Sequence, residues 1–135
     1  MLPLLVKRLI SCKNGRMNGD EHAGAFCPLF HHAIELIGRR WTGAILRALS
    51  RGTDRFSTLT ETIPGLSDRM LSERLKELEA EGIVSRTVIP DIPVRITYHL
   101  TAKGEALGGV MDAIGQWAYD WLATEPLPDD EAAAD

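Results

Sequence analysis

Hydrophobic residues along positions 27–82 recur at intervals of three and four, which is the spacing of one face of an α-helix. Glycine and proline interrupt this pattern and divide it into four predicted helices. These helices cover residues 28–37, 41–52, 55–63 and 67–81. A Pro64-Gly65 turn separates the third helix from the fourth, so these two predict a helix-turn-helix unit whose second helix is the reading helix.

The fourth predicted helix, residues 67–81, has both of its ends marked in the sequence. Ser67 is a favourable N-cap, Asp68 places negative charge in the first turn, and Gly82 suits a left-handed exit. Its inner face is a row of leucines at helical spacing, namely Leu71, Leu75 and Leu78. The sequence therefore predicts that one side of this helix packs on a core.

Polar side chains occupy the opposite side of the same helix. At about 100° per residue, Arg69, Glu73 and Lys76 lie together there, with Ser72 at the edge. Any surface helix shows such a pattern, so a simply solvated face is one interpretation. A surface for a polar partner is the other, and the helix-turn-helix arrangement favours it.

After Gly82 the period of the hydrophobic positions changes from about 3.6 residues to about 2, which indicates β-strands. Two alternating segments within residues 83–100 flank the sequence P-D-I-P. They predict a two-stranded hairpin with a proline-stiffened tip. Helix, turn, helix and hairpin is the order of a winged helix-turn-helix, so the predicted fold class is mainly α with a two-stranded β wing.

A last helix is predicted from a cap at Thr101 to residue 122. Its broad apolar stripe contains Leu107, Val110, Met111, Ile114, Trp117, Ala118, Trp121 and Leu122. Two tryptophans exceed what a small core needs, so part of the stripe is expected to bury against a second subunit. The alternative is that this helix folds back onto its own domain.

Length and composition are those of one globular domain, with 135 residues of which 44% are hydrophobic and 25% charged. The expected divisions are a poorly ordered lead over residues 1–25, the winged domain over 26–123, and an acidic disordered tail over 124–135. The net charge is −4, but one segment of the chain has more basic than acidic residues. Several arginines that fall close together favour a polyanionic partner, and they are Arg39, Arg40, Arg47, Arg51 and Arg55.

Other features exclude several classes of protein. Two cysteines, Cys12 and Cys27, are too few for a secreted disulfide framework and indicate a reducing compartment. No apolar run approaches the roughly 18–20 residues of a membrane span, so a cytoplasmic protein without membrane association is expected. The sequence has no glycine-rich phosphate loop, nucleophile elbow or paired carboxylates, so neither an enzyme nor a cofactor is predicted.

A set of specific segments runs through the predicted helices and the wing. They are C-P-L at 27–29, E-L-I-G-R-R-W-T-G-A-I-L-R-A-L at 35–49, R-F-S-T-L at 55–59, I-P-G-L-S-D-R-M-L-S-E-R-L-K-E-L-E-A-E-G-I-V at 63–84, and P-x-x-P-x-R-I-T-Y-H-L-T-A-K-G at 90–104. In these segments the chain resembles the HxlR family of bacterial winged helix-turn-helix transcriptional regulators, over roughly residues 27–122. It departs at Arg39-Arg40, where the family often has Gly-Lys, and at Ile89, where an aromatic residue is common.

The resemblance implies a sequence-specific regulator that binds an inverted-repeat operator in double-stranded DNA as a homodimer. The reading surface would be the helix 67–81 together with the wing 83–100. The dimer would form through the N- and C-terminal helices, and its expected contacts are Leu29, Ala33, Val110, Ile114, Trp117 and Trp121. The alternative is a winged-helix module that binds protein, which has no need of the arginine–lysine front found here.

Each polar residue of the reading surface has an expected role. Arg69 is the candidate for guanine, because its guanidinium can donate to O6 and N7 together. Glu73 either accepts from cytosine or orients Arg69 from the next turn. Arg95, beside the wing tip, is expected to meet phosphate or the adjacent minor groove. Further phosphate contacts are expected from Arg55, Thr58, Ser67, Ser72 and Lys76.

Cys27 precedes Pro28 at a predicted helix start, where the amide dipoles favour the reactive thiolate. In the family this position senses oxidants or electrophiles in some members, which implies a small effector of that class, with Cys12 as a candidate resolving partner. A half-buried cysteine packed at the dimer interface is the alternative. Cys27, His31 and His32 lack a further ligand cluster, so no metal site is predicted.

Overall fold

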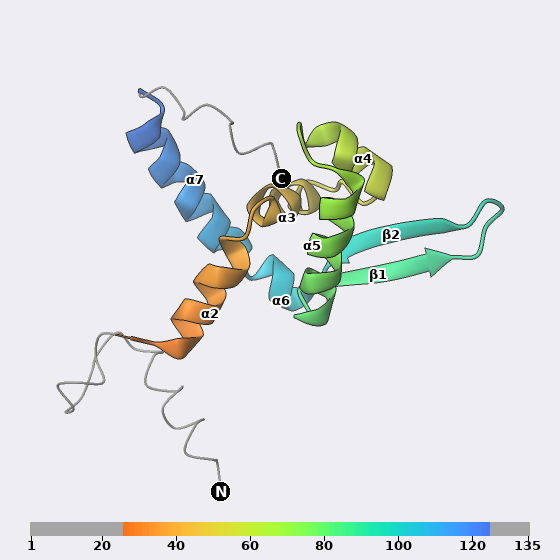
Figure 1. Ribbon diagram of the computed structural model, residues 1–135, viewed down its shortest axis with the longest axis horizontal. Coiled ribbons are helices and arrows are strands. Elements are labelled where there is room, and N and C mark those ends of the chain that lie inside the picture. The colour runs from red at the N-terminus through yellow and green to blue at the C-terminus, as the bar shows by residue number, and fades with distance from the viewer. Residues whose placement is uncertain (1–25, 125–135) are drawn as a thin grey trace, which may run out of the picture. The chain divides into compact units, whose positions relative to one another are not determined.

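The computed structural model describes residues 26–124 (Figure 1). The expected N-terminal lead, which contains Cys12, and all but the first residue of the expected acidic tail lie outside this range. The chain divides into two compact units, residues 1–40 and 41–135. The described helix of the first unit is α2 (Pro28–Ile37). The second unit contains α3 (Thr42–Ser50), α4 (Phe56–Thr62), α5 (Asp68–Ala80), β1 (Val84–Ile89), β2 (Arg95–Leu100), α6 (Ala102–Glu105) and α7 (Gly108–Leu122).

Helix α2 begins where the sequence predicts. Cys27 is its N-cap and Pro28 occupies the first helical position, where the missing amide proton would have had no helical partner. No residue of α2 is buried. Large apolar side chains, those of Leu29, Phe30 and Ile34, are between 44% and 67% exposed.

The core of the second unit lies between α3, α4, α5 and the base of the hairpin. The predicted inner faces of these helices supply it, and the side chains that are at most 2% exposed include Ile45, Leu59, Leu71, Leu75, Leu78, Ile83 and Val84. Phe56, which the spacing places in this core, is only half-buried because it starts α4 at the edge of the packed region. Each helix is too short to be stable alone, so this shared core holds the three together.

The predicted hairpin is confirmed and forms the wing. Its strands pair antiparallel, from Val84 opposite Leu100 to Ile89 opposite Arg95. Two backbone hydrogen bonds anchor the base: Ile83 N–H donates to the Leu78 carbonyl at 2.9 Å, and Tyr98 N–H donates to the Asp54 carbonyl at 2.8 Å. The wing therefore starts directly at the end of α5 and projects away from it (Figure 1).

The expectation of one continuous C-terminal helix from residue 101 is wrong, because the segment forms two helices, α6 and α7. Thr101 caps α6 as predicted, and its Oγ1 accepts a hydrogen bond from Gly104 N–H at 3.2 Å. Gly104 rests directly on the carbonyl of Ile83, and Lys103 Nζ donates to the Glu81 carbonyl at 2.6 Å. These contacts fix the direction of α6 at the wing base, and the chain turns before α7 starts.

Candidate nucleic-acid interface

Helix α5 has the ends that the sequence predicts. Ser67 is extended and its Oγ accepts a hydrogen bond from Met70 N–H at 3.2 Å. Asp68 lies in the first turn, and Gly82 leaves the helix with a φ of 75°, in the left-handed region that glycine tolerates. The start of the reading helix is therefore fixed by a cap, and its end by a required glycine.

Trp41 positions the turn in front of α5. Its backbone is left-handed, with a φ of 73°, which is uncommon for a bulky residue and places it as the N-cap of α3 instead of inside the helix. Its ring covers Gly65, where an added Cβ would lie 3.2 Å from Cη2. Gly65 itself has a φ of 82°. The tryptophan ring and the glycine together set the path of the chain from α4 into α5.

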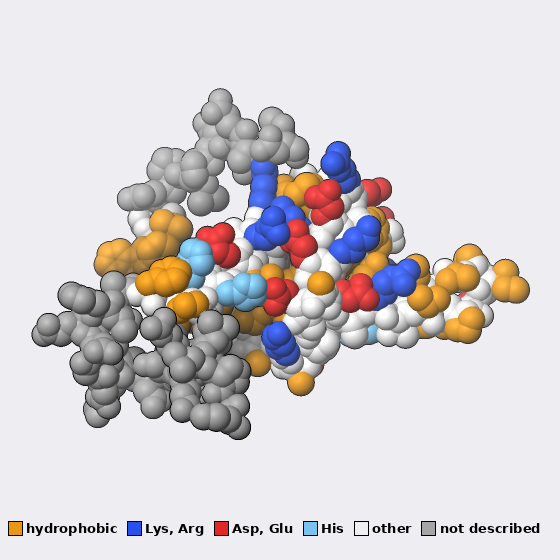
Figure 2. All heavy atoms as spheres, turned by 60° about the horizontal axis from the view of Figure 1, so that its bottom comes forward, with side chains coloured by type: hydrophobic (Ala, Val, Ile, Leu, Met, Phe, Trp, Pro, Cys, Tyr) orange, Lys and Arg blue, Asp and Glu red, His pale blue; other side chains and the backbone are white. Residues whose placement is uncertain are grey.

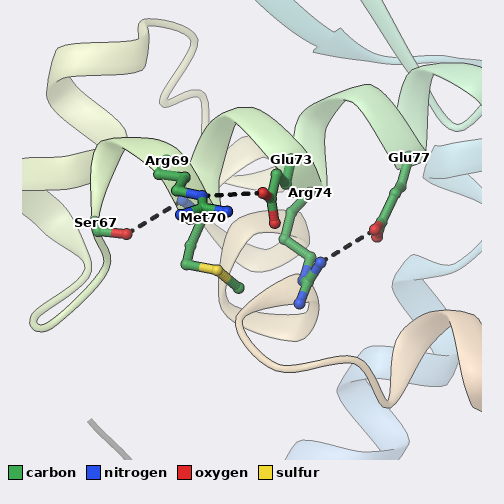
Figure 3. Close-up of polar contacts among 6 residues, drawn as sticks. All are labelled: Ser67, Arg69, Met70, Glu73, Arg74 and Glu77. Atoms are coloured by element: carbon green, nitrogen blue, oxygen red, sulfur yellow. Dashed lines mark hydrogen bonds and ion pairs between the residues drawn. The ribbon is translucent and has the colours of Figure 1, made fainter. Parts of the chain in front are cut away.

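The predicted outer face of α5 is exposed. Arg69 Nε donates to Glu73 Oε1 at 3.3 Å, and the two side chains are 87% and 46% exposed (Figure 3). Glu73 is therefore placed to orient the Arg69 side chain, which is one of the two roles predicted for it. An exposed pair of this kind is worth about 0.3–0.5 kcal/mol, so Arg69 can leave it for another partner at low cost. Lys76 is also exposed on this face, whereas Ser72 is half-buried.

Arg74 is a polar residue of α5 that the sequence reasoning missed. Its residue is only 9% exposed, and its Nη1 donates to Glu77 Oε1 at 3.1 Å, away from the Arg69 pair (Figure 3). Its burial could have been predicted from its helical position, because residue 74 lies between Leu71 and Leu78 beside the inner face. A buried arginine is retained only with polar partners. Arg74 therefore belongs to the support of the reading helix and is not on its reading surface.

The remaining phosphate candidates lie on or near this surface. Ser67 uses its oxygen as the helix cap, which leaves its O–H proton as a donor. Arg55 is exposed as the N-cap of α4, and Thr58 is exposed on the first turns of that helix. Helices α4 and α5 contact each other. The structure thus exposes donors on both helices of the helix-turn-helix, and their roles toward DNA stay predictions.

The arginines that fall close together along the sequence are divided between different elements of the structure. Arg47 lies on α3, and its Nη1 is 3.6 Å from the position that a Cβ on Gly115 of α7 would take. It therefore extends along α7. Arg39 and Arg40 belong to the first unit of the chain.

The wing carries Arg95 where the sequence predicts it. Arg95 is the first residue of β2, is exposed, and pairs with Ile89 next to the tip formed by residues 90–94. Figure 2 shows hydrophobic side chains gathered at the far end of the wing. Arginine thus borders an apolar tip.

The apolar stripe of α7 divides into two faces. Met111, Gly115 and Ala118 are half-buried, and the Met111 Cε lies 3.3 Å from the position of a Cβ on Gly43 of α3. The other face consists of Val110, Ile114, Trp117 and Trp121, which are between 45% and 68% exposed. No residue of α7 is buried. Ala33 and Leu29 of α2 are exposed as well, so every expected dimer contact is accessible in the single chain.

Cys27 is disulfide-bonded in this structure, and its Sγ also accepts a hydrogen bond from Phe30 N–H at 3.5 Å. The chain's other cysteine, Cys12, lies outside the described residues. His31 Nε2 is directed to Glu35 Oε1 at 3.9 Å, and its ring contacts that of Phe26. The thiol reactivity predicted for Cys27 therefore concerns the reduced form of the chain, in which this disulfide is open.

Across residues 26–124 no three histidine, cysteine, aspartate or glutamate side chains gather as metal ligands would. No helix within this range combines the length and hydrophobicity needed to cross a bilayer.

Comparison with known proteins gives a consistent picture. The family model described as HxlR-like helix-turn-helix matches residues 36–126. The chain is 49% identical over 106 residues to the HTH-type transcriptional regulator YvaP of Bacillus subtilis, a match that covers 78% of this chain and 94% of that protein. It is also 49% identical over 92 residues to the regulator YodB of the same organism, covering 68% of this chain and 82% of YodB.

Solved structures agree with this. Reduced YodB superimposes with a TM-score of 0.66 at 44% identity, over 75% of this chain and 99% of YodB. The redox regulator HypR in its reduced form gives a TM-score of 0.64 at 30% identity, over 68% of this chain and 91% of HypR. A quinone-bound form of YodB gives a TM-score of 0.61 at 44% identity, over 71% of this chain and 100% of that protein.

Proposed function

Since the chain belongs to the HxlR-like helix-turn-helix family of transcriptional regulators, we propose that it binds an inverted-repeat operator in double-stranded DNA as a homodimer, without enzymatic activity. The observation that carries this proposal is the outer face of α5. It presents Arg69 and Lys76 on the exposed side of a capped helix whose opposite side packs on the core. A helix of this kind can enter the major groove and expose donors to base edges and phosphates.

The proposed dimer follows from the exposed face of α7. A contiguous row of four large apolar side chains on a terminal helix is unfavourable in water and is typical of an interface. A two-fold dimer that enters successive major grooves on one side of the duplex must hold its two copies of α5 about 34–36 Å apart, one turn of the duplex. An inverted repeat with that spacing between half-sites is the matching operator.

Replacing Arg69 by alanine is expected to relax the base preference at one guanine in each half-site. A bidentate arginine–guanine pair contributes about 1–3 kcal/mol of discrimination, and the exposed Arg69–Glu73 pair costs little to break. Competition binding with operator duplexes changed at single positions measures this preference. An Arg69→Ala protein with the wild-type preference at every position would contradict the assignment.

Lys76→Ala is the matched comparison from the same face of the helix. A phosphate contact carries no sequence information, so this variant should weaken binding to all duplexes alike. It should also reduce the slope of log affinity against log salt by about one unit per subunit. The contrast between the two variants separates a base contact from a phosphate contact.

We further propose that Cys27 makes DNA binding responsive to oxidants or electrophiles. The support is its place at the start of α2, its disulfide in this structure, and the similarity of the chain to the redox regulator HypR and to YodB, which has been solved in a quinone-bound form. A change at the start of α2 would alter the dimer that α2 and α7 are proposed to form. Operator binding would respond because both half-sites must be held in register.

Cys27→Ser is expected to abolish this response while leaving binding under reducing conditions within about twofold. Serine keeps a helix-capping side chain, so α2 should retain its start. Operator affinity measured with and without diamide or a quinone provides the test. Equal loss of binding by wild-type and Cys27→Ser proteins would exclude Cys27 as the sensor.

The other candidate function is a winged-helix module that binds protein. The exposed apolar faces of α2 and α7 fit such a role, whereas the arginine and lysine of α5 do not require it. A gel shift with the promoter DNA beside the protein's own gene, at two salt concentrations, distinguishes the two. Salt-sensitive binding of a discrete fragment supports the regulator, and absence of binding supports the protein module.

A further inference from the structure

The wing tip combines exposure with hydrophobicity to an unusual degree. Among the described residues, Ile92 has the highest exposure of any large hydrophobic side chain, at 102%, and Val94 is 61% exposed. Pro90 and Pro93 are exposed beside them. Figure 2 shows hydrophobic side chains gathered at the end of the wing. Burial of these apolar side chains against a partner would lower the free energy, because it removes them from water.

The conformation of the wing tip and its distance from the base of the wing are both fixed by the hairpin. Asp91 N–H donates to the Ile89 carbonyl at 2.8 Å and closes the turn, and the two prolines fix their own φ angles. Six-residue strands carry the tip about 20 Å from the base. That base is bonded to Leu78 in the last turns of α5. A ligand that α5 contacts is therefore within reach of the wing.

The charges behind the tip indicate what covers it. Arg86 pairs with Tyr98, and Arg95 pairs with Ile89. Residues 86 and 95 thus lie on opposite faces of the hairpin, because pairs alternate between faces along an antiparallel ladder. Both arginines are exposed, and Asp91 is the one acid of residues 83–100. A ribbon with an apolar end and a cation on each face matches the minor groove, where phosphates line both sides of the base edges.

We propose that residues 90–94 enter the minor groove beside the segment contacted by α5, with Ile92 acting as a wedge at a base step. Arg86 and Arg95 hold the phosphate strands on the two sides. Apolar wedges of this kind partly unstack the bases and kink the duplex. The kink favours flexible TA or CA/TG steps, so the wing selects sequence without hydrogen bonds to bases. This inference rests on the proposed function, because it requires operator binding.

The test compares Ile92→Ser and Arg95→Ala with a control, Tyr119→Gln, in the whole chain. Tyr119 is 74% exposed on α7, outside the wing and outside the row Val110, Ile114, Trp117 and Trp121, so its replacement removes exposed hydrophobicity away from both proposed interfaces. The probe is the promoter DNA beside the protein's own gene, shortened to its hydroxyl-radical footprint. Three quantities are measured: affinity at several salt concentrations, duplex bending by energy transfer between end labels, and permanganate reactivity of thymines under the wing.

Ile92→Ser is expected to weaken binding about tenfold, to reduce the bend and to remove the permanganate signal, without changing the salt slope. Arg95→Ala should lower the slope by about one unit per subunit. Tyr119→Gln should bind within about twofold of wild type. Ile92 is fully exposed, so Ile92→Ser should keep the wild-type melting temperature.

Two outcomes would contradict the proposed wedge, and they differ in whether wild-type protein binds the promoter fragment. A wild-type complex with a straight duplex, or an Ile92→Ser protein with unchanged affinity and bend, overturns the wedge while leaving the regulator intact; the tip would then face a protein or lipid surface. Failure of wild-type protein to bind the promoter fragment contradicts the proposed function itself and removes the wedge with it.

Discussion

Replacement of Ile114 by glutamate is expected to convert the proposed dimer to a monomer and to weaken operator binding by roughly 100-fold or more. Ile114 lies in the middle of the exposed row Val110, Ile114, Trp117 and Trp121 on α7. A second subunit covering this row would bury an unpaired carboxylate, which costs about 3–5 kcal/mol. A monomer binds each half-site independently and loses the gain in effective concentration from linked sites.

Sedimentation at several protein concentrations measures the first effect, and a titration of operator DNA measures the second. Gln116→Glu is the matched control, because Gln116 is exposed on another side of α7 and donates to Asp120 at 2.8 Å. It adds the same charge to the same helix and should leave the dimer intact. An Ile114→Glu protein that sediments as wild type does would show that this face of α7 is not the interface.

Gly104→Ala is expected to lower the free energy of unfolding by about 2–3 kcal/mol, the upper range for overpacking a well-packed site. A Cβ at Gly104 would overlap the carbonyl oxygen of Ile83 and approach the Ile83 Cγ2 and Leu100 Cδ2 at 3.1 Å. The same carbonyl accepts a hydrogen bond from Thr101 N–H at 3.0 Å. The Ile83 carbonyl is part of the backbone and cannot rotate out of the way as a flexible side chain can. Relief of the overlap therefore requires α6 to shift from the wing base.

Urea denaturation at one fixed protein concentration measures this loss, because dimer formation also contributes to stability. Gly108→Ala is the control. Gly108 begins α7, and a Cβ there meets no atom within 4 Å. Alanine has the higher helix propensity, so this variant should be as stable as wild type or slightly more stable. Equal stability of Gly104→Ala and wild type would mean that α6 is not fixed against the wing.

The ends and the two faces of α5 could be predicted from the sequence because their signals are local. The cap at Ser67, the leucine spacing of residues 71–78 and the exit at Gly82 act within a few residues of each other, and all appear in the structure. The hairpin was equally readable, since alternation and two prolines define strands and tip. The resemblance to HxlR-type regulators is confirmed by the family match over residues 36–126.

Contacts between segments distant in sequence were not readable in this way. The helical position of Arg74 beside Leu71 was a local signal, but its 9% exposure follows only from packing against other segments. The break between α6 and α7 arises because Gly104 meets Ile83, a residue 21 positions earlier in the chain. Trp41 fits a helical stripe by spacing, but its contact with Gly65 holds it in a left-handed turn ahead of α3.

The sequence by itself determined the winged helix-turn-helix, the bounds of α5 and the residues of its outer face, because helix caps, hydrophobic periods and turn residues act locally. Only the tertiary structure decided which apolar side chains stay uncovered. It divided the stripe of α7 into a half-buried and an exposed face, and it brought Ile92 to the end of a wing flanked by arginines. Exposure depends on what every other segment covers, and no local pattern contains that information.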